Sequence, residues 1–441
     1  MRAYILPHPP IAVPEVGGDE IRKIESTEEA FAKAAADIAG YDPETIVVIS
    51  PHAPLLADAF YMSKGHSCEG DLSLFNAPYP RVSYKYDTEL SDEIARLCRE
   101  HQMPLYYTDE EAAELDHGTV VPLYFVNREY TDAKAKKQIA PYRIVRLSPG
   151  FLPDDKLLEM GRIIERAIAH IGRRAVIIAS GDLSHKLKED GPYGFIKEGP
   201  LFDKAVTDVM KSGKLEDFTK IDRKINELSA NCGYHGFVML AGALGGYRIT
   251  PKFLSYEGAF GVGYGLCIFE CEDWYVRLAR ASLEKYIKTG SALLPSETEE
   301  YPDSLRDRQA GVFVCIKKHG ELRGCIGTIL PTCDSTLSET IELAISAGTS
   351  DPRFPVVTAD ELSLLDYTVD VMGRPESATR SMLDEKRYGV IVTKGHRRGL
   401  LLPNLEGVDS VEEQLDISCR KGGIDPSGDY GIERFMVERH S

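Results

Sequence analysis

Four histidines in the first part of the chain have settings that suit metal or proton chemistry. His8 lies in the run LPHPP, His52 in SPHAP, His117 in LDHGTVVPL and His185 in SGDLSH. His8, His52 and His185 each follow an apolar run that has the character of a strand, and ligands bind at the carboxyl ends of strands in open α/β sheets. The prolines beside His8 and His52 also fix the backbone there. This recurrence favours a functional histidine set over isolated surface histidines.

Two imidazoles with one carboxylate or thiolate form a ligand set for a divalent transition metal. Two histidines and a carboxylate suit non-haem Fe(II) and O2, whereas Zn or Cu also accept imidazole. His8 and His52 are the predicted imidazole ligands. The third ligand has two candidates: Glu257 follows a strand in LSYEG, and Cys232 precedes a helix in NCGYHG, where a thiol ionises more readily. The residues leave this choice open.

His185 suits general acid/base chemistry better than ligation. Asp182 stands three residues before it, close enough to orient the ring or to tune its pKa. We therefore predict His185, His117 and Asp182 as the residues that act on substrate, beside the metal ligands.

The elements that must position these residues alternate along residues 1–271. Continuously apolar runs predict strands at Ala3–Leu6, Thr45–Ser50, Tyr142–Leu147, Ala175–Ser180, Phe253–Tyr256 and Tyr264–Phe269. Amphipathic segments predict helices at Ser26–Ala39, Asp87–His101, Asp154–Ile171, Pro200–Ser212 and Gly236–Leu244. Buried strands separated by helices indicate a layered α/β domain whose sheet is covered on both faces.

Residues 272–441 have enough length and pattern for a second, smaller α/β (α+β) domain. Helices are predicted at Trp274–Lys288 and Ser335–Ala347, a surface loop at Gly290–Asp303, and strands at Gly311–Lys317, Leu365–Val371 and Gly389–Thr393.

Three segments of this second part could carry chemistry. ELRGCIGT contains Arg323 and Cys325, DPRFP presents Arg353, and GHRRG presents His396. Together they could form a positive pocket, with Cys325 as a thiolate nucleophile or carrier, because a guanidinium favours thiolate. The alternative is a packed strand cysteine and unrelated solvated cations.

Composition limits the class of protein. The chain has 441 residues, 43% of them hydrophobic, and a net charge of −17, which argues against a general nucleic-acid or anionic-membrane binder. No apolar run is long enough for a membrane span, and the N-terminus lacks a signal peptide, so we expect a cytoplasmic protein. Nine scattered cysteines predict reduced thiols; Cys267 and Cys271 lack the second pair that a structural zinc site needs.

The ordered motifs LPHPP, SPHAP, LDHGTVVPL, SGDLSH, NCGYHG and SYEGAFGVGYG resemble the class III extradiol dioxygenase (LigB-type) superfamily, which includes the Memo-like proteins. The resemblance implies an Fe(II) site that cleaves a catechol- or aminophenol-like ring with O2. It also implies that His8 and His52 bind the metal, His185 is the acid/base, and His117 contacts substrate. Dioxygenases of this superfamily have a glutamate where this chain has Cys232, whereas the Memo-like branch has a cysteine. That difference favours softer metals and leaves a non-catalytic, metal-binding scaffold as the alternative.

ELRGCIGT, DPRFPVV and GLLLP resemble the family named after the Alport-syndrome, midface-hypoplasia and elliptocytosis chromosomal region. No accepted catalytic residues come with that family. A LigB-like half followed by this half is similar to the AmmeMemoRadiSam system protein A family, whose name implies pathway partners of the Memo-like and radical-SAM types. We also expect a homo-oligomer, the common state of soluble proteins.

Overall fold

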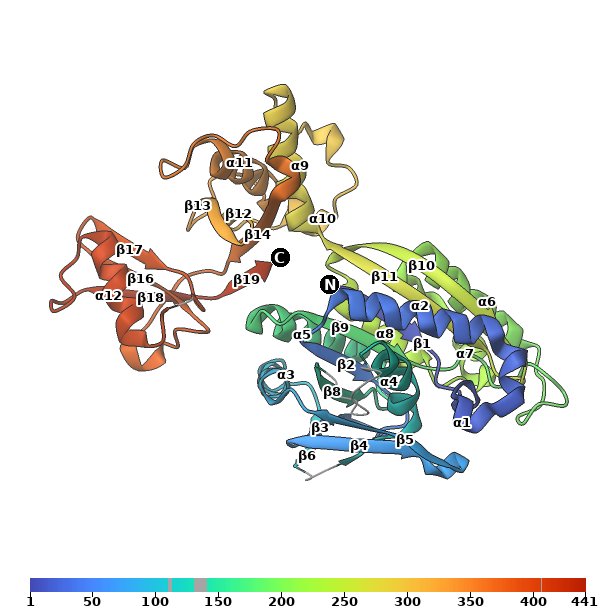
Figure 1. The fold of residues 1–441 in the computed structure, drawn as a ribbon. Helices are drawn as coiled ribbons and strands as arrows, with labels where there is room; N and C mark the ends of the chain where they lie inside the picture. Colours follow the sequence, from blue (N-terminus) through green and yellow to red (C-terminus); the bar gives the residue numbers. More distant parts are fainter. Residues whose placement is uncertain (110–112, 131–140, 406) are drawn as a thin grey trace. The chain divides into compact units, whose positions relative to one another are not determined.

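The computed structural model describes residues 1–109, 113–130, 141–405 and 407–441 (Figure 1). It divides into two compact units, Met1–Glu272 and Asp273–Ser441. Each unit has hydrophobic clusters of its own.

The first unit is built on an eight-stranded mixed sheet with the order β10-β11-β1-β9-β2-β8-β3-β6. Its strands are β1 (Arg2–Leu6), β2 (Thr45–Ile49), β3 (Phe60–Lys64), β6 (Leu105–Asp109), β8 (Arg143–Ser148), β9 (Ala175–Ser180), β10 (Tyr247–Glu257) and β11 (Tyr264–Asp273). The central strands β1, β9, β2 and β8 run parallel, whereas β11 is antiparallel to β1 and β3 is antiparallel to β8. The predicted α/β fold with a mixed sheet is confirmed.

Helices cover both faces of this sheet because the side chains of its buried strands alternate between two cores. Along β1, Ala3 and Ile5 join one cluster, and Tyr4 and Leu6 join the other. The first cluster packs against α3 (Thr88–Glu100), α5 (Asp154–Ile171), α6 (Glu198–Ser212) and α8 (Tyr234–Leu244). The second packs against α2 (Glu25–Tyr41) and α4 (His117–Glu129). The central strands therefore end between two helical layers (Figure 1).

Helix α4 was not predicted from the sequence. It is apolar on all sides and buried along most of its length, so it has no amphipathic stripe, and Pro122 lies inside it. Proline has no backbone N–H, and the carbonyl of Gly118 four residues earlier therefore has no helical partner at that position.

Smaller elements complete the first unit. They are a three-stranded sheet, β5-β4-β7, made of β4 (Ser67–Leu72), β5 (Ala77–Lys85) and β7 (Ala113–Glu114), together with η1 (Pro10–Ala12), α1 (Pro14–Gly17), η2 (Gly18–Ile24), η3 (Ser73–Phe75), η4 (Leu215–Lys220) and α7 (Arg223–Ser229).

The second unit contains two four-stranded antiparallel sheets, β13-β12-β14-β19 and β15-β18-β16-β17. Their strands are β12 (Val312–Lys318), β13 (Glu321–Gly327), β14 (Leu365–Met372), β15 (Glu376–Ser377), β16 (Gly389–Lys394), β17 (Arg397–Leu401), β18 (Gly431–Phe435) and β19 (Val437–His440). The helices are α9 (Trp274–Thr289), η5 (Pro295–Glu297), α10 (Asp303–Asp307), α11 (Thr336–Thr349), η6 (Leu362–Leu364), η7 (Arg380–Met382) and α12 (Val411–Gly422). Helices α9 and α11 pack on the first sheet and α12 on the second, which confirms the smaller α+β unit. Within the described part of the chain, no helix combines the length and apolar character that crossing a bilayer requires.

Candidate metal centre

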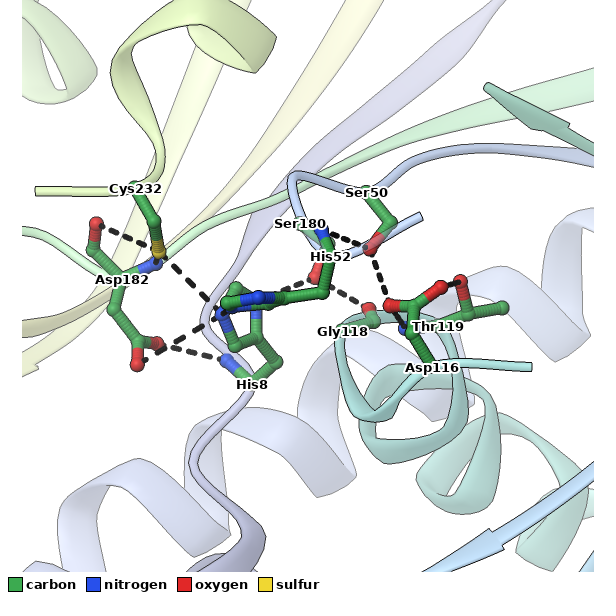
Figure 2. A network of polar contacts seen from close by, with 9 residues as sticks. All are labelled: His8, Ser50, His52, Asp116, Gly118, Thr119, Ser180, Asp182 and Cys232. Atoms are coloured by element: carbon green, nitrogen blue, oxygen red, sulfur yellow. Dashed lines mark hydrogen bonds and ion pairs between the residues drawn. The ribbon is translucent and has the colours of Figure 1, made fainter. Parts of the chain in front are cut away.

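Side chains from separate segments meet beyond the carboxyl ends of the parallel strands. His8 follows β1, His52 follows β2, Asp182 follows β9, and Cys232 precedes α8 (Figure 2). Potential ligand atoms form two groups, and within each group all of these atoms lie within 4.8 Å of one another. One group is His8, His52 and His117, and the other is His8, Asp182 and Cys232. His8 belongs to both groups.

The Nε2 atom of His8 is the centre of this arrangement. It lies 3.0 Å from Nε2 of His52, 3.5 Å from Sγ of Cys232 and 4.0 Å from Oδ2 of Asp182. Imidazole, thiol and carboxyl groups therefore surround one small volume, and all of them are donor types that bind transition metals.

The tautomer of His8 is set by Ser180, the last residue of β9. The Ser180 hydroxyl donates its single proton to the free carbonyl of Gly118, at 2.5 Å. Its oxygen can therefore only accept a hydrogen bond from Nδ1–H of His8, 2.9 Å away. Consequently Nδ1 carries the imidazole proton, and the lone pair of Nε2 faces the other donor groups. Pro122 supports this relay, because a residue with an N–H at that position would compete for the Gly118 carbonyl.

Asp116 joins the end of β2 to the start of α4. It accepts hydrogen bonds from the Ser50 hydroxyl and from an N–H of the first helical turn, and it pairs with buried Arg146 at 3.1 Å. His117, the first residue of α4, consequently lies against His52, with 4.1 Å between the ring centroids.

A contact between two glycines brings Asp182 and Cys232 together. A Cβ on Gly181 would lie 2.3 Å from Cα of Gly233, so only glycine allows these two segments to approach so closely. The Asp182 N–H then donates to Cys232 Sγ at 3.3 Å, and the Asp182 carboxylate accepts from the His8 N–H at 2.9 Å. The carboxylate thus contacts His8, whereas the sequence predicted that it orients the ring of His185 or tunes its pKa.

Burial shifts the pKa of each of these groups in the direction that favours its uncharged form. Loss of hydration lowers the pKa of His117 to about 4 and that of His8 well below its ordinary value. It raises the pKa of Asp182 to about 7 and that of the Cys232 thiol well above its ordinary value. A bound cation favours the anionic forms and neutral imidazole. The donor set therefore fits a divalent transition metal.

His185 lies near the histidine cluster but makes different contacts. Its Nε2 is buried, and no hydrogen-bond partner for it exists among the residues that the structure describes. Burial and the nearby His52 lower the pKa of His185 to about 4, so the ring is neutral at neutral pH. The ring of exposed Tyr193 lies beside it, with 5.1 Å between centroids. His185 thus offers a neutral ring nitrogen that can accept a proton.

The other candidate for the third ligand lies elsewhere. The Glu257 carboxylate accepts hydrogen bonds from the N–H and the hydroxyl of Thr27, at 2.7 and 2.6 Å, near the start of α2. Glu257 belongs to neither group of potential ligands, so the geometry favours Cys232.

The candidate residues of the second unit do not gather into one positive pocket. Arg323 pairs with Glu361 at 2.9 Å, and Arg353 pairs with Asp351 at 2.7 Å. His396 lies exposed in the turn between β16 and β17, in the other sheet. The ELRGCIGT and DPRFP segments do lie against each other, since Arg323 donates to the Pro355 carbonyl at 2.8 Å and Arg353 donates to the Cys325 carbonyl at 3.2 Å. Each guanidinium nevertheless has a carboxylate partner, so the predicted positive pocket does not form.

The fold and this cluster define the first unit as an α/β domain with a candidate metal centre after its central strands. Residues 2–267 match the family described as "Catalytic LigB subunit of aromatic ring-opening dioxygenase", and residues 276–440 match AMMECR1. The chain therefore belongs to the LigB family and carries an AMMECR1 domain after its LigB domain.

Relatives share both parts or one of them. A protein of Clostridium acetobutylicum is 42% identical over 473 residues, covering 99% of this chain and 98% of its own length. A protein of Thermotoga maritima is 49% identical and covers 38% of this chain and 98% of its own length. Among solved structures, an uncharacterized protein of Pyrococcus horikoshii is 34% identical, covers 38% of this chain and 88% of its own, and has a TM-score of 0.35. An uncharacterized protein of Escherichia coli K12 is 18% identical, covers 61% and 99%, and has a TM-score of 0.43.

Proposed function

We propose that the first unit is a metal-dependent oxidoreductase of the extradiol type, acting with O2 on a catechol- or aminophenol-like ring. His8, His52, Cys232 and Asp182 would hold the metal, Fe(II) in the first place and Zn or Cu as alternatives. The observation that carries the proposal is the convergence of these donor atoms on Nε2 of His8 within a LigB-family fold.

The residues around the centre divide the work of binding and proton transfer. When bound, the metal supplies a Lewis-acid and redox centre for substrate and O2. His185 would accept a proton from a substrate hydroxyl at its buried Nε2, which has no hydrogen-bond partner among the described residues, and would return it later. His117 lies against His52 and Phe75, with 5.2 Å between the His117 and Phe75 centroids, and contacts a bound ring from this side.

Metal content tests the ligand assignment. The protein is purified anaerobically, loaded with Fe(II) and assayed for bound metal beside the variants His8→Ala and Cys232→Ala. We expect about one ion per chain in the wild type and at least a tenfold weaker affinity in each variant. Glu257→Gln is the control that should keep the wild-type affinity, because Glu257 contacts Thr27 instead. Unchanged binding in both ligand variants would contradict the assignment.

O2 consumption with a panel of catechols and aminophenols tests the chemistry. We expect uptake with a ring-opened product in the wild type, and a rate at least 100-fold lower in His185→Gln with metal binding retained.

A second candidate function follows from Cys232. A thiolate favours softer metals such as copper, so the unit would then be a Memo-like metal-binding scaffold that works with a radical-SAM partner. Copper or zinc binding with no O2 uptake across the panel would favour this candidate over the oxygenase.

A further inference from the structure

A cysteine pair in the second unit contradicts the expectation that all thiols are reduced. Cys315 on β12 and Cys325 on the edge strand β13 are directly opposite partners, with 4.1 Å between their Cα atoms, and they form a disulfide. Both residues are half-buried, so neither is sealed in the core of the unit. The other seven cysteines are free.

The backbone brings the two sulfurs together. The Cys325 N–H donates to Asp351 at 2.9 Å, and its carbonyl accepts from Arg353 at 3.2 Å. The backbone N–H and carbonyl of Cys325 thus point away from β12, which makes Cys315 and Cys325 a non-hydrogen-bonded pair of the two strands. Facing side chains approach most closely at such positions.

Contacts other than the disulfide hold β13 in place. Gly324 packs so tightly on α11 that a Cβ there would lie 2.0 Å from the carbonyl oxygen of Ala347. Arg323 is bound by Glu361 at 2.9 Å. The flanking residues therefore keep Cys325 opposite Cys315 after reduction, and the same bond can form again.

The disulfide adds little as a structural link. It joins residues only 10 apart in sequence, within a hairpin whose strands already pair. The stabilisation from a disulfide grows with the length of the loop that it closes. Chemistry at the sulfurs is a better reason for a cysteine at both positions.

We propose that Cys315 and Cys325 form a reversible dithiol–disulfide centre that exchanges with small thiols. An external thiolate attacks one sulfur, forms a mixed disulfide and releases the other cysteine as a thiolate, which takes a proton. A second external thiol displaces the first. The cysteines gain two electrons and two protons, and two external thiols become one disulfide. This proposal is independent of the function of the metal centre.

Thiol labelling of the full chain tests the proposal. The native protein is equilibrated with mixtures of reduced and oxidised glutathione, quenched in acid, denatured and labelled with a maleimide. Peptide mass spectrometry then measures the labelled fraction of each cysteine. We expect the labelled fractions of Cys315 and Cys325 to fall together as oxidised glutathione increases. The midpoint of this transition should depend on the ratio of the squared concentration of reduced glutathione to the concentration of oxidised glutathione. Dithiothreitol added to the native protein should restore both labels.

Two controls make the result specific. Buried Cys267 should be labelled at every ratio, and Cys315→Ser should abolish the joint transition of Cys325. Full labelling of both cysteines at all ratios, a change at only one of them, or a pair that native reduction cannot open would each overturn the proposal. An unchanged transition of Cys325 in Cys315→Ser would do so as well.

Discussion

The hydroxyl of Ser180 determines which nitrogen of His8 carries the proton. The hydroxyl donates its one proton to the Gly118 carbonyl, so its oxygen accepts a hydrogen bond from Nδ1–H of His8. This relay is why Nε2 is available to a metal.

Replacing Ser180 by alanine should weaken metal binding about 10–100-fold, the usual effect of losing a hydrogen bond that orients a ligand. Fe(II) titration of Ser180→Ala measures this. Ser212→Ala is the matched control, because that hydroxyl donates to Val209 at the end of α6. Equal affinities in all three proteins would show that Ser180 does not set the tautomer.

Asp203 makes the stability of the first unit depend on pH. Burial raises its pKa from 3.8 to about 7, while Tyr256 and the Ser184 N–H hydrogen-bond to it. The folded state therefore binds more protons than the unfolded state between these two values. The contribution of Asp203 to stability is present below pH 4 and is lost as the pH rises to 7.

We expect Asp203→Asn to remove the loss of stability that the wild type shows as the pH rises to 7. In metal-free protein, the free energy of unfolding of the variant relative to the wild type should increase between pH 5 and pH 8, by about 2–3 kcal/mol. Urea unfolding at both pH values measures the difference. A constant difference would contradict the raised pKa.

Helix α4 shows how an element can depend on its N-cap residue. Asp116 caps the helix, accepts from Ser50 and pairs with buried Arg146. Removal of the Asp116 carboxylate would leave the buried guanidinium of Arg146 without this ion-pair partner.

Asp116→Ala should consequently destabilise the first unit by about 3–5 kcal/mol, the effect of breaking a buried ion pair. Asp222→Ala is the control: Asp222 caps α7 at the surface and accepts from Ile225, so its loss should cost about 1 kcal/mol. Denaturant unfolding distinguishes the two, and similar losses would mean that the Arg146 pair contributes nothing.

The same helix marks the limit of what the sequence predicts. Strands β2 and β9 were predictable because they are continuously apolar, and His8 and His52 because prolines flank them at strand ends. Helix α4 has no polar face and contains proline, so its pattern carries no helical signal. The contacts of Asp182 and Glu257 depend on how distant segments meet, which no local pattern encodes.

At the scale of the whole molecule, the chain combines two units with separate cores. Relatives exist with both parts, and the Thermotoga maritima protein matches a share of the chain about the size of the second unit. We therefore expect the units to unfold in separate transitions.

Bound metal should raise the unfolding temperature of the first unit only. At 100 times its dissociation constant, a ligand stabilises the folded state by about 2.7 kcal/mol, which corresponds to roughly 5–10 °C for a unit of this size. Calorimetry with and without Fe(II) checks this, with Cys232→Ala as the protein that should not respond. A metal-induced shift of both transitions would show that the units are coupled.

The edge strand β13 has a consequence for self-association. Free N–H and carbonyl groups at the border of a sheet can recruit a strand from another molecule and begin aggregation. At Cys325 these two groups are already occupied by the carboxylate of Asp351 and the guanidinium of Arg353. The DPR segment therefore protects the border of the sheet against intermolecular strand addition at this residue.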